Sequence, residues 1–309
     1  MSPFSPPFSP PASVRPARLC RTWMFLEGAN ESVLAAAPAC GADVLIQELE
    51  DFTPPALRPK AREMAPRIYA GWRAAGAVVA VRVNPLADGG LEDLEAVMAG
   101  RPDIVALPKV AEPRQVAELD AHVSRLEQAY GYPSGSTALL PNIEFARGLV
   151  QLGAIAAASP RVTACLLAAE DLAADLGAER EPDSLELAYA RQRFLVECVA
   201  AGIVAVDCPY TWADREGADR DARWARRLGY RAKSAVDPAH APVITAAFTP
   251  ASAEVEAAER LVRAFEAARE KGEARVELDG ALVEVPGYLT AKRRLARAAE
   301  LSSWRPGGA

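Results

Sequence analysis

PNIEFARG at residues 141–148 and AEDLAADLG at residues 169–177 are the two stretches that decide the fold and the chemistry. Each follows a short apolar run that is typical of a β-strand, and a carboxylate stands where each run ends, at Glu144 and at Asp171. Two carboxylates at neighbouring strand ends can hold one Mg²⁺, whose other ligands are water and substrate oxygens. The pattern therefore predicts a magnesium-dependent enzyme that acts on an oxyacid.

Short β-like runs alternate with longer helical runs along most of the chain. This alternation favours parallel pairing through right-handed crossovers, and eight such units indicate an α/β fold, a closed (β/α)8 TIM barrel. A doubly wound sheet is the alternative, but Glu27 and Gly28 follow the first strand in place of a Gly-x-Gly-x-x-Gly motif. The predicted strands span residues 22–25, 44–49, 78–83, 104–107, 138–143, 163–167, 203–206 and 232–236.

The sequence divides into three regions. Residues 1–18 are rich in proline and lack the apolar core of a signal peptide, so we expect a disordered tail. Residues 19–249 are the predicted catalytic barrel. Residues 250–309 are predicted to form a helix-hairpin-helix extension, with a turn at Asp279 and Gly280. So short an extension would not be stable alone, and we expect it to pack on the barrel or on a neighbouring subunit.

The composition argues against a nucleic acid or a membrane as the partner of this protein. Of the 309 residues, 50% are hydrophobic, the net charge is −6, and no basic run points to a nucleic acid. No apolar stretch reaches the roughly 18 residues that a membrane span needs. The five cysteines are unclustered, which suits a cytoplasmic protein. Only two histidines are present, so acid–base chemistry would fall to carboxylates, lysine or water.

Charged residues gather where the predicted strands end, which is where a (β/α)8 barrel places its active site. They are Glu48, Glu50 and Asp51; Arg82 and Asn84; Lys109; Glu144; Glu170 and Asp171; and Lys233, Ser234 and Asp237. An ion-pair network that closes the barrel mouth is one interpretation. Burying so many charges without a ligand is costly, so a metal with an oxyanion substrate is favoured.

In that interpretation Glu144 and Asp171 hold the cation, and Arg82 clamps a substrate carboxylate or an enolate oxygen with its planar fork of donors. The implied chemistry is a metal-stabilised enolate, the intermediate of aldol cleavage or Claisen condensation. Lys109 raises a rival mechanism, a Schiff base with a ketone substrate. Nearby carboxylates would keep this amine protonated, so an ion pair or a phosphate contact is favoured.

Five motifs occur in order, at residues 45–51, 82–84, 107–109, 143–148 and 170–177. Together they resemble the citrate lyase beta-subunit-like enzymes of the HpcH/HpaI aldolase superfamily, alongside malyl-CoA and citramalyl-CoA lyases. The resemblance runs from about residue 21 to about residue 299. It implies a (β/α)8 barrel with a C-terminal extension, a Mg²⁺ cofactor, and a homotrimer or homohexamer.

The resemblance also implies roles for single residues. Glu144 and Asp171 match the metal ligands, and Arg82 matches the arginine that binds the substrate carboxylate or carbonyl. Glu50 and Asp51 match acids that orient metal-bound water.

A further acid comes from the tail. In related lyases a tail aspartate reaches into a neighbouring subunit as acid or base, and Glu284 stands at the matching position in DGALVEVP, residues 279–286. Besides Arg82, the predicted substrate contacts are Lys109, Glu48 and Arg21, the last as a candidate for CoA phosphates.

The rim departs from the family pattern at the first strand, which usually ends Phe-Val-Pro-Gly and here ends with Glu27 before Gly28. The resemblance as a whole implies a Mg²⁺-dependent carbon–carbon lyase for a hydroxyacyl-CoA such as malyl-CoA or citramalyl-CoA, with thioester hydrolysis after condensation as a close variant. Glu27 and the changed rim motivate one alternative, a CoA-independent metal-dependent aldolase on free hydroxy-oxo acids, giving pyruvate or glyoxylate. Another is a non-catalytic subunit of a lyase complex.

Overall fold

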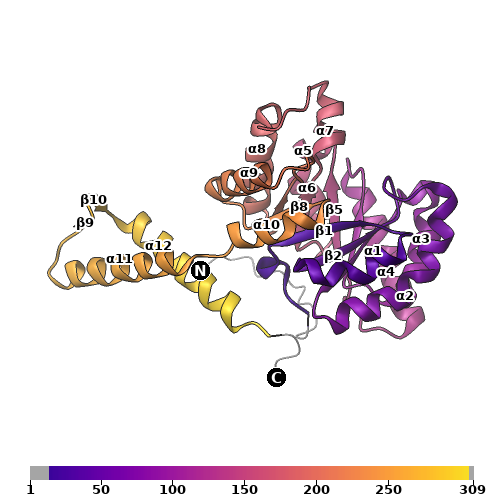
Figure 1. Cartoon of the computed structure of the whole chain (residues 1–309), viewed down its shortest axis with the longest axis horizontal. Helices are drawn as coiled ribbons and strands as arrows, with labels where there is room; N and C mark the ends of the chain where they lie inside the picture. Colours follow the sequence, from indigo (N-terminus) through magenta and orange to yellow (C-terminus); the bar gives the residue numbers. More distant parts are fainter. Residues whose placement is uncertain (1–13, 306–309) are drawn as a thin grey trace. The chain divides into compact units, whose positions relative to one another are not determined.

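The computed structural model describes residues 14–305 (Figure 1). The chain forms two compact units, of which the first ends at Phe248 and the second begins at Thr249. Most of the predicted tail, residues 1–13, lies outside the described residues. Just after them, Ala17–Leu19 form a short 3-10 helix.

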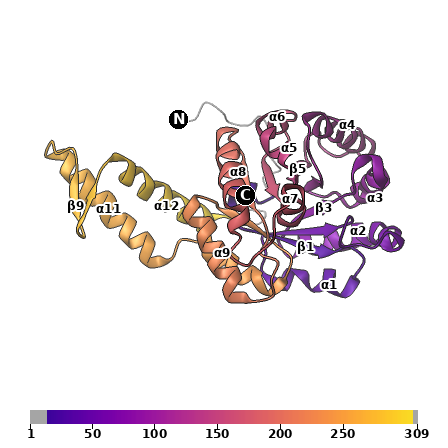
Figure 2. The ribbon, with the colours of Figure 1, turned by 90° about the horizontal axis from the view of Figure 1, so that it is seen from above.

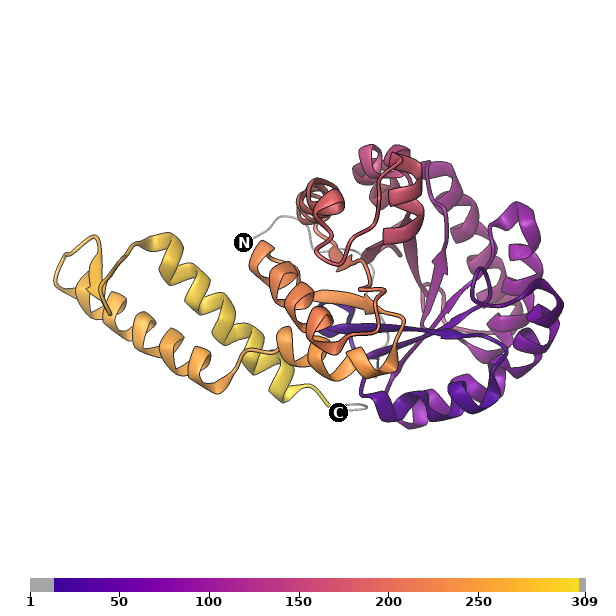
Figure 3. The same cartoon turned by 45° about the horizontal axis from the view of Figure 1, so that its top comes forward.

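The first unit is a closed barrel of eight parallel strands that neighbour one another in chain order (Figure 3). The barrel closes where β8 pairs with β1, with Ser234 opposite Trp23. The predicted (β/α)8 fold is therefore confirmed. The strands are β1 (Thr22–Glu27), β2 (Val44–Glu48), β3 (Val78–Arg82), β4 (Ile104–Leu107), β5 (Ala138–Ile143), β6 (Ala164–Leu167), β7 (Val204–Asp207) and β8 (Ala232–Ala235).

Helices cover the outside of these strands (Figure 2). They are α1 (Glu31–Ala36), α2 (Arg58–Ala74), α3 (Leu91–Val97), α4 (Pro113–Tyr130), α5 (Ala146–Val150), α6 (Leu152–Ala157), α7 (Ala169–Leu176), α8 (Ala188–Ala200), α9 (Arg215–Leu228) and α10 (Ala241–Ala247). Within residues 14–305, no helix has both the length and the apolar character that crossing a membrane requires.

Alternation along the strands separates an inner core from an outer one. In β2, Val44 and Ile46 belong to the cluster inside the barrel, whereas Leu45 packs with the helices. At the carboxyl ends the inward positions become polar, because the next residue inward after Ile46 is Glu48 and the next after Ala80 is Arg82. The fold thus places a polar layer on top of an apolar barrel core.

A second buried polar cluster lies between the strands and the helices. Arg191 of α8 donates from Nε and Nη2 to the two Asp207 oxygens, at 3.0 and 2.6 Å. Its Nη1 lies 2.7 Å from Asp221 of α9, and Lys233 Nζ lies 2.7 Å from Asp207. The prediction that Lys233 faces the barrel mouth is therefore wrong. Ala232 points inward, so the next residue of the strand points to the helices.

Replacing Lys233 by Met should destabilise the barrel, because Asp207 and Asp221 would share only Arg191. Removing one member of a buried ion cluster typically costs about 3–5 kcal/mol, whereas an exposed pair contributes at most about 1 kcal/mol. Urea unfolding of Lys233→Met should show the larger loss. Arg220→Ala, an exposed residue on α9 that pairs loosely with Asp214 at 3.8 Å, is the control. Equal losses in the two variants would contradict this reading of the cluster.

The second unit has the predicted order of helix, hairpin and helix: α11 (Ser252–Glu270), β9 (Val276–Leu278), β10 (Ala281–Val283) and α12 (Val285–Ser303). α11 and α12 lie side by side (Figure 1), and the rings of Phe265 and Tyr288 stack between them at 4.8 Å. Asp279 and Gly280 form the hairpin turn with φ of 51° and 77°. Two consecutive left-handed residues are what a two-residue hairpin turn demands, and Asp-Gly meets that demand.

Candidate active site

Arg82 lies at the centre of the polar layer. Glu48, Arg82 and Glu144 are 0%, 6% and 0% exposed. Arg82 donates from Nε to Glu48 at 2.9 Å, its Nη2 lies 3.2 Å from Glu50 Oε2, and its Nη1 lies 3.6 Å from Glu144 Oε1. Burial opposes the charge of Arg82, but the three carboxylates outweigh burial and raise its pKa. Arg82 is therefore a fixed cation held by three acids.

Glu48 is engaged by the protein itself. Its Oε1 accepts the Glu50 N–H at 2.6 Å and its Oε2 accepts the Phe52 N–H at 2.6 Å, in addition to the bond from Arg82. Both oxygens thus hold the loop after β2 and the guanidinium in place. This geometry assigns Glu48 to positioning Arg82, in place of the predicted substrate contact.

Two aromatic rings lie beside the guanidinium. The Cζ atom of Arg82 is 5.1 Å from the Phe25 ring centre and 5.8 Å from that of Phe52. The rings meet edge to face at 6.5 Å, and Phe52 is 43% exposed. Sequence reasoning gave Phe52 no role, although a large apolar residue directly after Glu50 and Asp51 was a visible signal.

Glu144 is buried, and neither of its carboxylate oxygens has a hydrogen-bond partner among residues 14–305. Burial raises the pKa of Glu144 to about 8; Arg82 opposes the rise, while Glu50 and Asp171 add to it. Asn142 precedes it on the same inward face of β5, and both of its amide atoms also lack partners in the described chain. Unpartnered buried oxygens call for a missing ligand, and hard oxygen donors fit a divalent cation such as Mg²⁺.

Asp171 lies in the first turn of α7, directly after β6, and is partly exposed. The Ala168 N–H donates to the Ile143 carbonyl at 3.0 Å, which joins the ends of β5 and β6 just before the two acids. The charge of Asp171 raises the pKa of Glu144, so the two carboxylates interact. No group of three or more His, Cys, Asp or Glu side chains forms a metal site in residues 14–305. A cation held here would complete its shell with water and substrate oxygens.

Lys109 contacts two of the acids in the loop after β2, Glu50 and Asp51. Its Nζ contacts Glu50 Oε1 and lies 3.6 Å from Asp51 Oδ1. Burial opposes the charged form, but the hydrogen bond with Glu50 and the charges of the nearby acids together outweigh it and raise the pKa of Lys109. A protonated amine is a poor nucleophile, so this arrangement disfavours the Schiff-base alternative.

The backbone around Lys109 is unusual and closely packed. Lys109 has φ of 56°, the left-handed region that non-glycine residues adopt at a cost of about 1–3 kcal/mol and mostly at functional sites. The next residue, Val110, donates its N–H to the Asn142 carbonyl at 3.1 Å. A Cβ on Gly148 would lie 2.3 Å from the Val110 carbonyl oxygen, so only glycine lets α5 approach this loop.

Two predicted site residues lie elsewhere. Arg21 precedes β1 and binds Asp43, which precedes β2, through Nε and Nη2 at 2.9 Å each. The amino ends of parallel strands are at the opposite end of the barrel from the mouth, so the prediction that Arg21 contacts substrate is wrong. Glu284 is an exposed residue at the start of α12 in the second unit, and its acid–base role stays a prediction.

A cleft of about 320 Å³ opens beside the carboxyl ends of β3 and β4. Its wall is apolar near the strands and polar farther out. It is lined by Pro85, Leu86, Ala87, Leu107, Pro108, Ala111, Glu112, Arg114, Gln115 and Glu118.

A closed (β/α)8 barrel with an arginine and buried acids at the carboxyl ends of its strands has the architecture of a TIM-barrel enzyme. The chain belongs to the HpcH/HpaI aldolase/citrate lyase family, whose family model matches residues 21–238. The beta subunit of citrate lyase from Escherichia coli (strain K12) is 36% identical over 295 residues, covering 94% of this chain and 97% of that protein.

Other relatives widen the range of activities. A (3S)-malyl-CoA thioesterase from Cereibacter sphaeroides (strain ATCC 17029) is 29% identical over 287 residues, covering 92% of this chain and 96% of that protein. Among solved structures, CitE from Mycobacterium tuberculosis in complex with magnesium, acetoacetate and coenzyme A is 27% identical. It superposes with a TM-score of 0.74 over 91% of this chain and 99% of that chain.

Replacing Glu144 by Gln should stabilise the metal-free protein at alkaline pH. The pKa of Glu144 rises from 4.5 to about 8 on folding, so its contribution to stability is present below about pH 4.5 and is lost as the pH rises through about 8. In EDTA, Glu144→Gln should melt above the wild type near pH 8 to 9, roughly one unit beyond the folded pKa, and the difference should shrink toward pH 5.

The control for this experiment is Glu92→Gln, which removes an acid whose side chain is 75% exposed. Its melting temperature should show no such pH-dependent gain. The same pH dependence in both variants would contradict a burial penalty at Glu144.

Proposed function

We propose that this protein is a Mg²⁺-dependent carbon–carbon lyase of the aldol or Claisen type, acting on a hydroxyacyl-CoA such as malyl-CoA or citramalyl-CoA. The observation that carries the proposal is Glu144, a buried carboxylate that interacts with Asp171 and faces Arg82, and whose two oxygens have no hydrogen-bond partner among residues 14–305. Glu144 and Asp171 would hold the cation, which when bound would supply a Lewis acid for a substrate carbonyl oxygen.

Arg82 would bind the substrate. Its Nε is committed to Glu48 and its Nη2 faces Glu50, so Nη1 is the donor turned toward Glu144. A guanidinium edge beside the metal ligands suits a substrate carboxylate or a developing oxyanion. Because Glu48 and Glu50 fix the guanidinium beforehand, no reorganisation is needed when charge develops.

Glu50, Asp51 and Lys109 would handle water and protons. Burial raises the pKa of Glu50, and Arg82 opposes the rise, so a proton is held more firmly there than on a solvated glutamate. Lys109 fixes the orientation of Glu50, and Asp51 is 51% exposed at the rim. These acids would orient a water molecule at the cation, and Lys109 would contact the substrate.

The relatives support the proposal without fixing the substrate. The Mycobacterium tuberculosis protein binds magnesium, acetoacetate and coenzyme A, and the part of the cleft near β3 and β4 that is lined by apolar residues offers room for an acyl chain. The Cereibacter sphaeroides relative supports thioester hydrolysis after condensation as a variant. None of the five cysteines, which all lie within residues 14–305, forms a disulfide bond, which suits activity in the cytoplasm.

A second candidate is a metal-dependent aldolase that uses free hydroxy-oxo acids and no CoA. Glu27 favours it: this acid follows the inward Phe25 by two positions, pairs in register with Glu48, and would repel phosphates near the mouth. The subunit name of the Escherichia coli relative keeps a third candidate open, a non-catalytic subunit of a lyase complex.

Both Glu144→Gln and Asp171→Asn should abolish turnover and Mg²⁺ binding, because each removes one of two protein ligands. Isothermal titration with Mg²⁺ gives the affinity, and product assays with malyl-CoA, citramalyl-CoA and a 4-hydroxy-2-oxo acid give the activity. Glu216→Gln, an acid with a 94% exposed side chain on α9, is the control and should leave both unchanged.

Each outcome separates the candidates. Cleavage of the CoA esters supports the main proposal, and turnover of only the free acid supports the aldolase. Normal turnover in Asp171→Asn would rule out the metal mechanism, and wild-type protein that neither binds Mg²⁺ nor turns over any substrate would support a non-catalytic subunit.

We also propose a homotrimer or homohexamer in which Glu284 of one subunit completes the site of another. Glu284→Gln should lower turnover while leaving Mg²⁺ affinity intact, because this residue is not a proposed ligand. Mixed oligomers of Arg82→Ala and Glu284→Gln subunits should regain activity, measured after co-refolding or subunit exchange. Absence of rescue, with mixed oligomers verified by mass spectrometry, would argue against a shared site.

A further inference from the structure

We infer that Asp175 is a positioning residue that sets the separation between the segment carrying Glu144 and the helix carrying Asp171. This inference rests on the proposed metal site and deepens it. Asp175 belongs to the AEDLAADLG motif at residues 169–177, but neither the sequence reasoning nor the proposed chemistry gave it a role.

The contact that carries the inference joins two helices. Asp175 Oδ2, in the last turn of α7, accepts the Ala146 N–H at 2.7 Å. Ala146 is the first residue of α5 and lies two positions after Glu144, and the preceding Phe145 provides no side-chain cap. The first N–H groups of a helix have no partner within the helix, so the Asp175 carboxylate takes over the capping of α5 from outside.

Two ties bracket the gap between the proposed ligands. Before the acids, the Ala168 N–H donates to the Ile143 carbonyl at 3.0 Å. After them, Asp175 binds Ala146. In the segment after β5, Glu144 lies between the two bonded residues Ile143 and Ala146. In the segment after β6, Asp171 lies between Ala168 and Asp175. The two hydrogen bonds therefore fix the spacing of the two carboxylates from both sides.

The periodicity of α7 explains how one helix carries both the proposed metal ligand Asp171 and the positioning residue Asp175. Asp171 and Asp175 are four residues apart, so they lie on the same face of the helix. One face of α7 therefore presents one carboxylate to the proposed cation and the next to the backbone that carries Glu144.

A purely local role for Asp175 is disfavoured. An acid in the last turn of a helix opposes the helix dipole, and α7 ends one residue later at Leu176, with Gly177 as its cap. Asp175 is also exposed, so it does not contribute to the core. Its contact with α5 is what remains to explain it.

The start of α7 is held separately. Glu170 accepts a hydrogen bond from the Thr211 hydroxyl at 2.8 Å and one from Arg180 Nε at 3.2 Å. These bonds join the first turn of α7 to the loop after β7 and to the loop that follows α7. Because Glu170 fixes the start of α7 and Asp175 fixes its end, the helix holds Asp171 in a defined position.

The test is the affinity for Mg²⁺, measured by titration calorimetry on the full chain and checked for folding by circular dichroism. Asp175→Ala removes the tie and should weaken Mg²⁺ binding about 10-fold, the usual lower effect of losing a group that orients a metal ligand. Asp175→Asn keeps an acceptor oxygen while losing the charge, so its affinity should stay close to that of the wild type. Asp175→Glu keeps the charge but displaces the carboxylate, and it should fall between the two.

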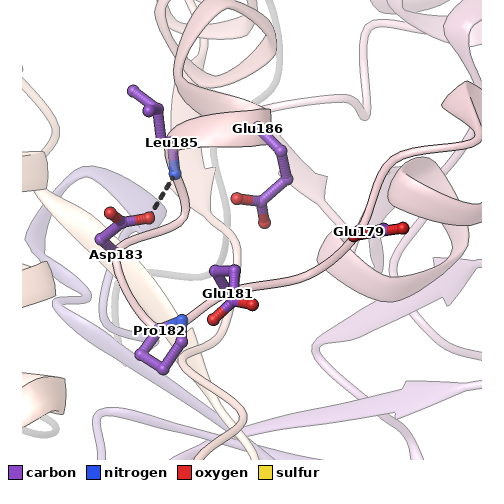
Figure 4. Close-up of a pocket in the computed structure, with 6 residues that line it drawn as sticks. All are labelled: Glu179, Glu181, Pro182, Asp183, Leu185 and Glu186. Carbon is purple, nitrogen blue, oxygen red and sulfur yellow. Dashed lines mark hydrogen bonds between the residues drawn. The ribbon is translucent and has the colours of Figure 1, made fainter.

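Asp183→Ala is the matched control. Asp183 is an exposed aspartate in the loop after α7 that also accepts one backbone N–H, from Leu185 at 3.1 Å (Figure 4). Its replacement removes the same charge and the same kind of bond, and the affinity for Mg²⁺ should not change.

Unchanged Mg²⁺ affinity in folded Asp175→Ala would overturn the inference, and so would an equal loss in Asp175→Asn, because charge rather than the tie would then be responsible. If Asp175→Ala does not fold, the comparison of Asp175→Glu with Asp175→Asn decides, and equal affinities overturn the inference. Loss of binding in Glu144→Gln with no loss in any Asp175 variant would leave the proposed metal site standing and remove only the role of Asp175. Wild-type protein that binds no Mg²⁺ would remove both.

Discussion

The mouth of this barrel depends on how the charge of Arg82 is neutralised. A guanidinium cannot lose its proton, so once β3 turns this side chain inward, the fold must supply carboxylates around it. Glu48 and Glu50 do so from the end of β2 and the loop after it, at 2.9 and 3.2 Å, and Glu144 does so from β5 at 3.6 Å. The positions of β2, β3 and β5 at this end of the barrel are thus linked through one cation.

Two of the buried ion clusters of the barrel are built differently. Between strands and helices, Arg191 and Lys233 are matched by Asp207 and Asp221, and both acids are held by both cations. At the mouth, the acids outnumber Arg82 and Lys109, and neither oxygen of Glu144 accepts a hydrogen bond from the described part of the chain. A balanced cluster stabilises a fold, whereas an acidic surplus in a buried site is what a bound cation would relieve. The contrast is the physical reason to look for the metal at the mouth.

Sequence reasoning reached the barrel, the hairpin and the place of Arg82 at the barrel mouth, because each follows from short periodicities and turn chemistry. Val81 and Val83 face the helices, so the alternation along β3 indicates that Arg82 points into the barrel. The direction of Lys233 could not be predicted in the same way, because its strand is short and its partners, Asp207 of β7 and Asp221 of α9, are far from it in the sequence. Arg21 was misplaced for a related reason: only the register of β1 and β2 reveals that it meets Asp43 at the amino ends. The engagement of both Glu48 oxygens depends on a loop geometry that no spacing rule predicts.

Burial of Lys233 has a practical consequence for anyone handling this protein. Its amine is 0% exposed and bound between two acids, whereas the side chain of Lys109 is 33% exposed. An amine-directed acylating reagent therefore reaches Lys109 in the folded chain but meets Lys233 only when the wall between β8 and its covering helices separates. The rate of labelling at Lys233, followed by peptide mass spectrometry, would thus report how often the barrel opens transiently.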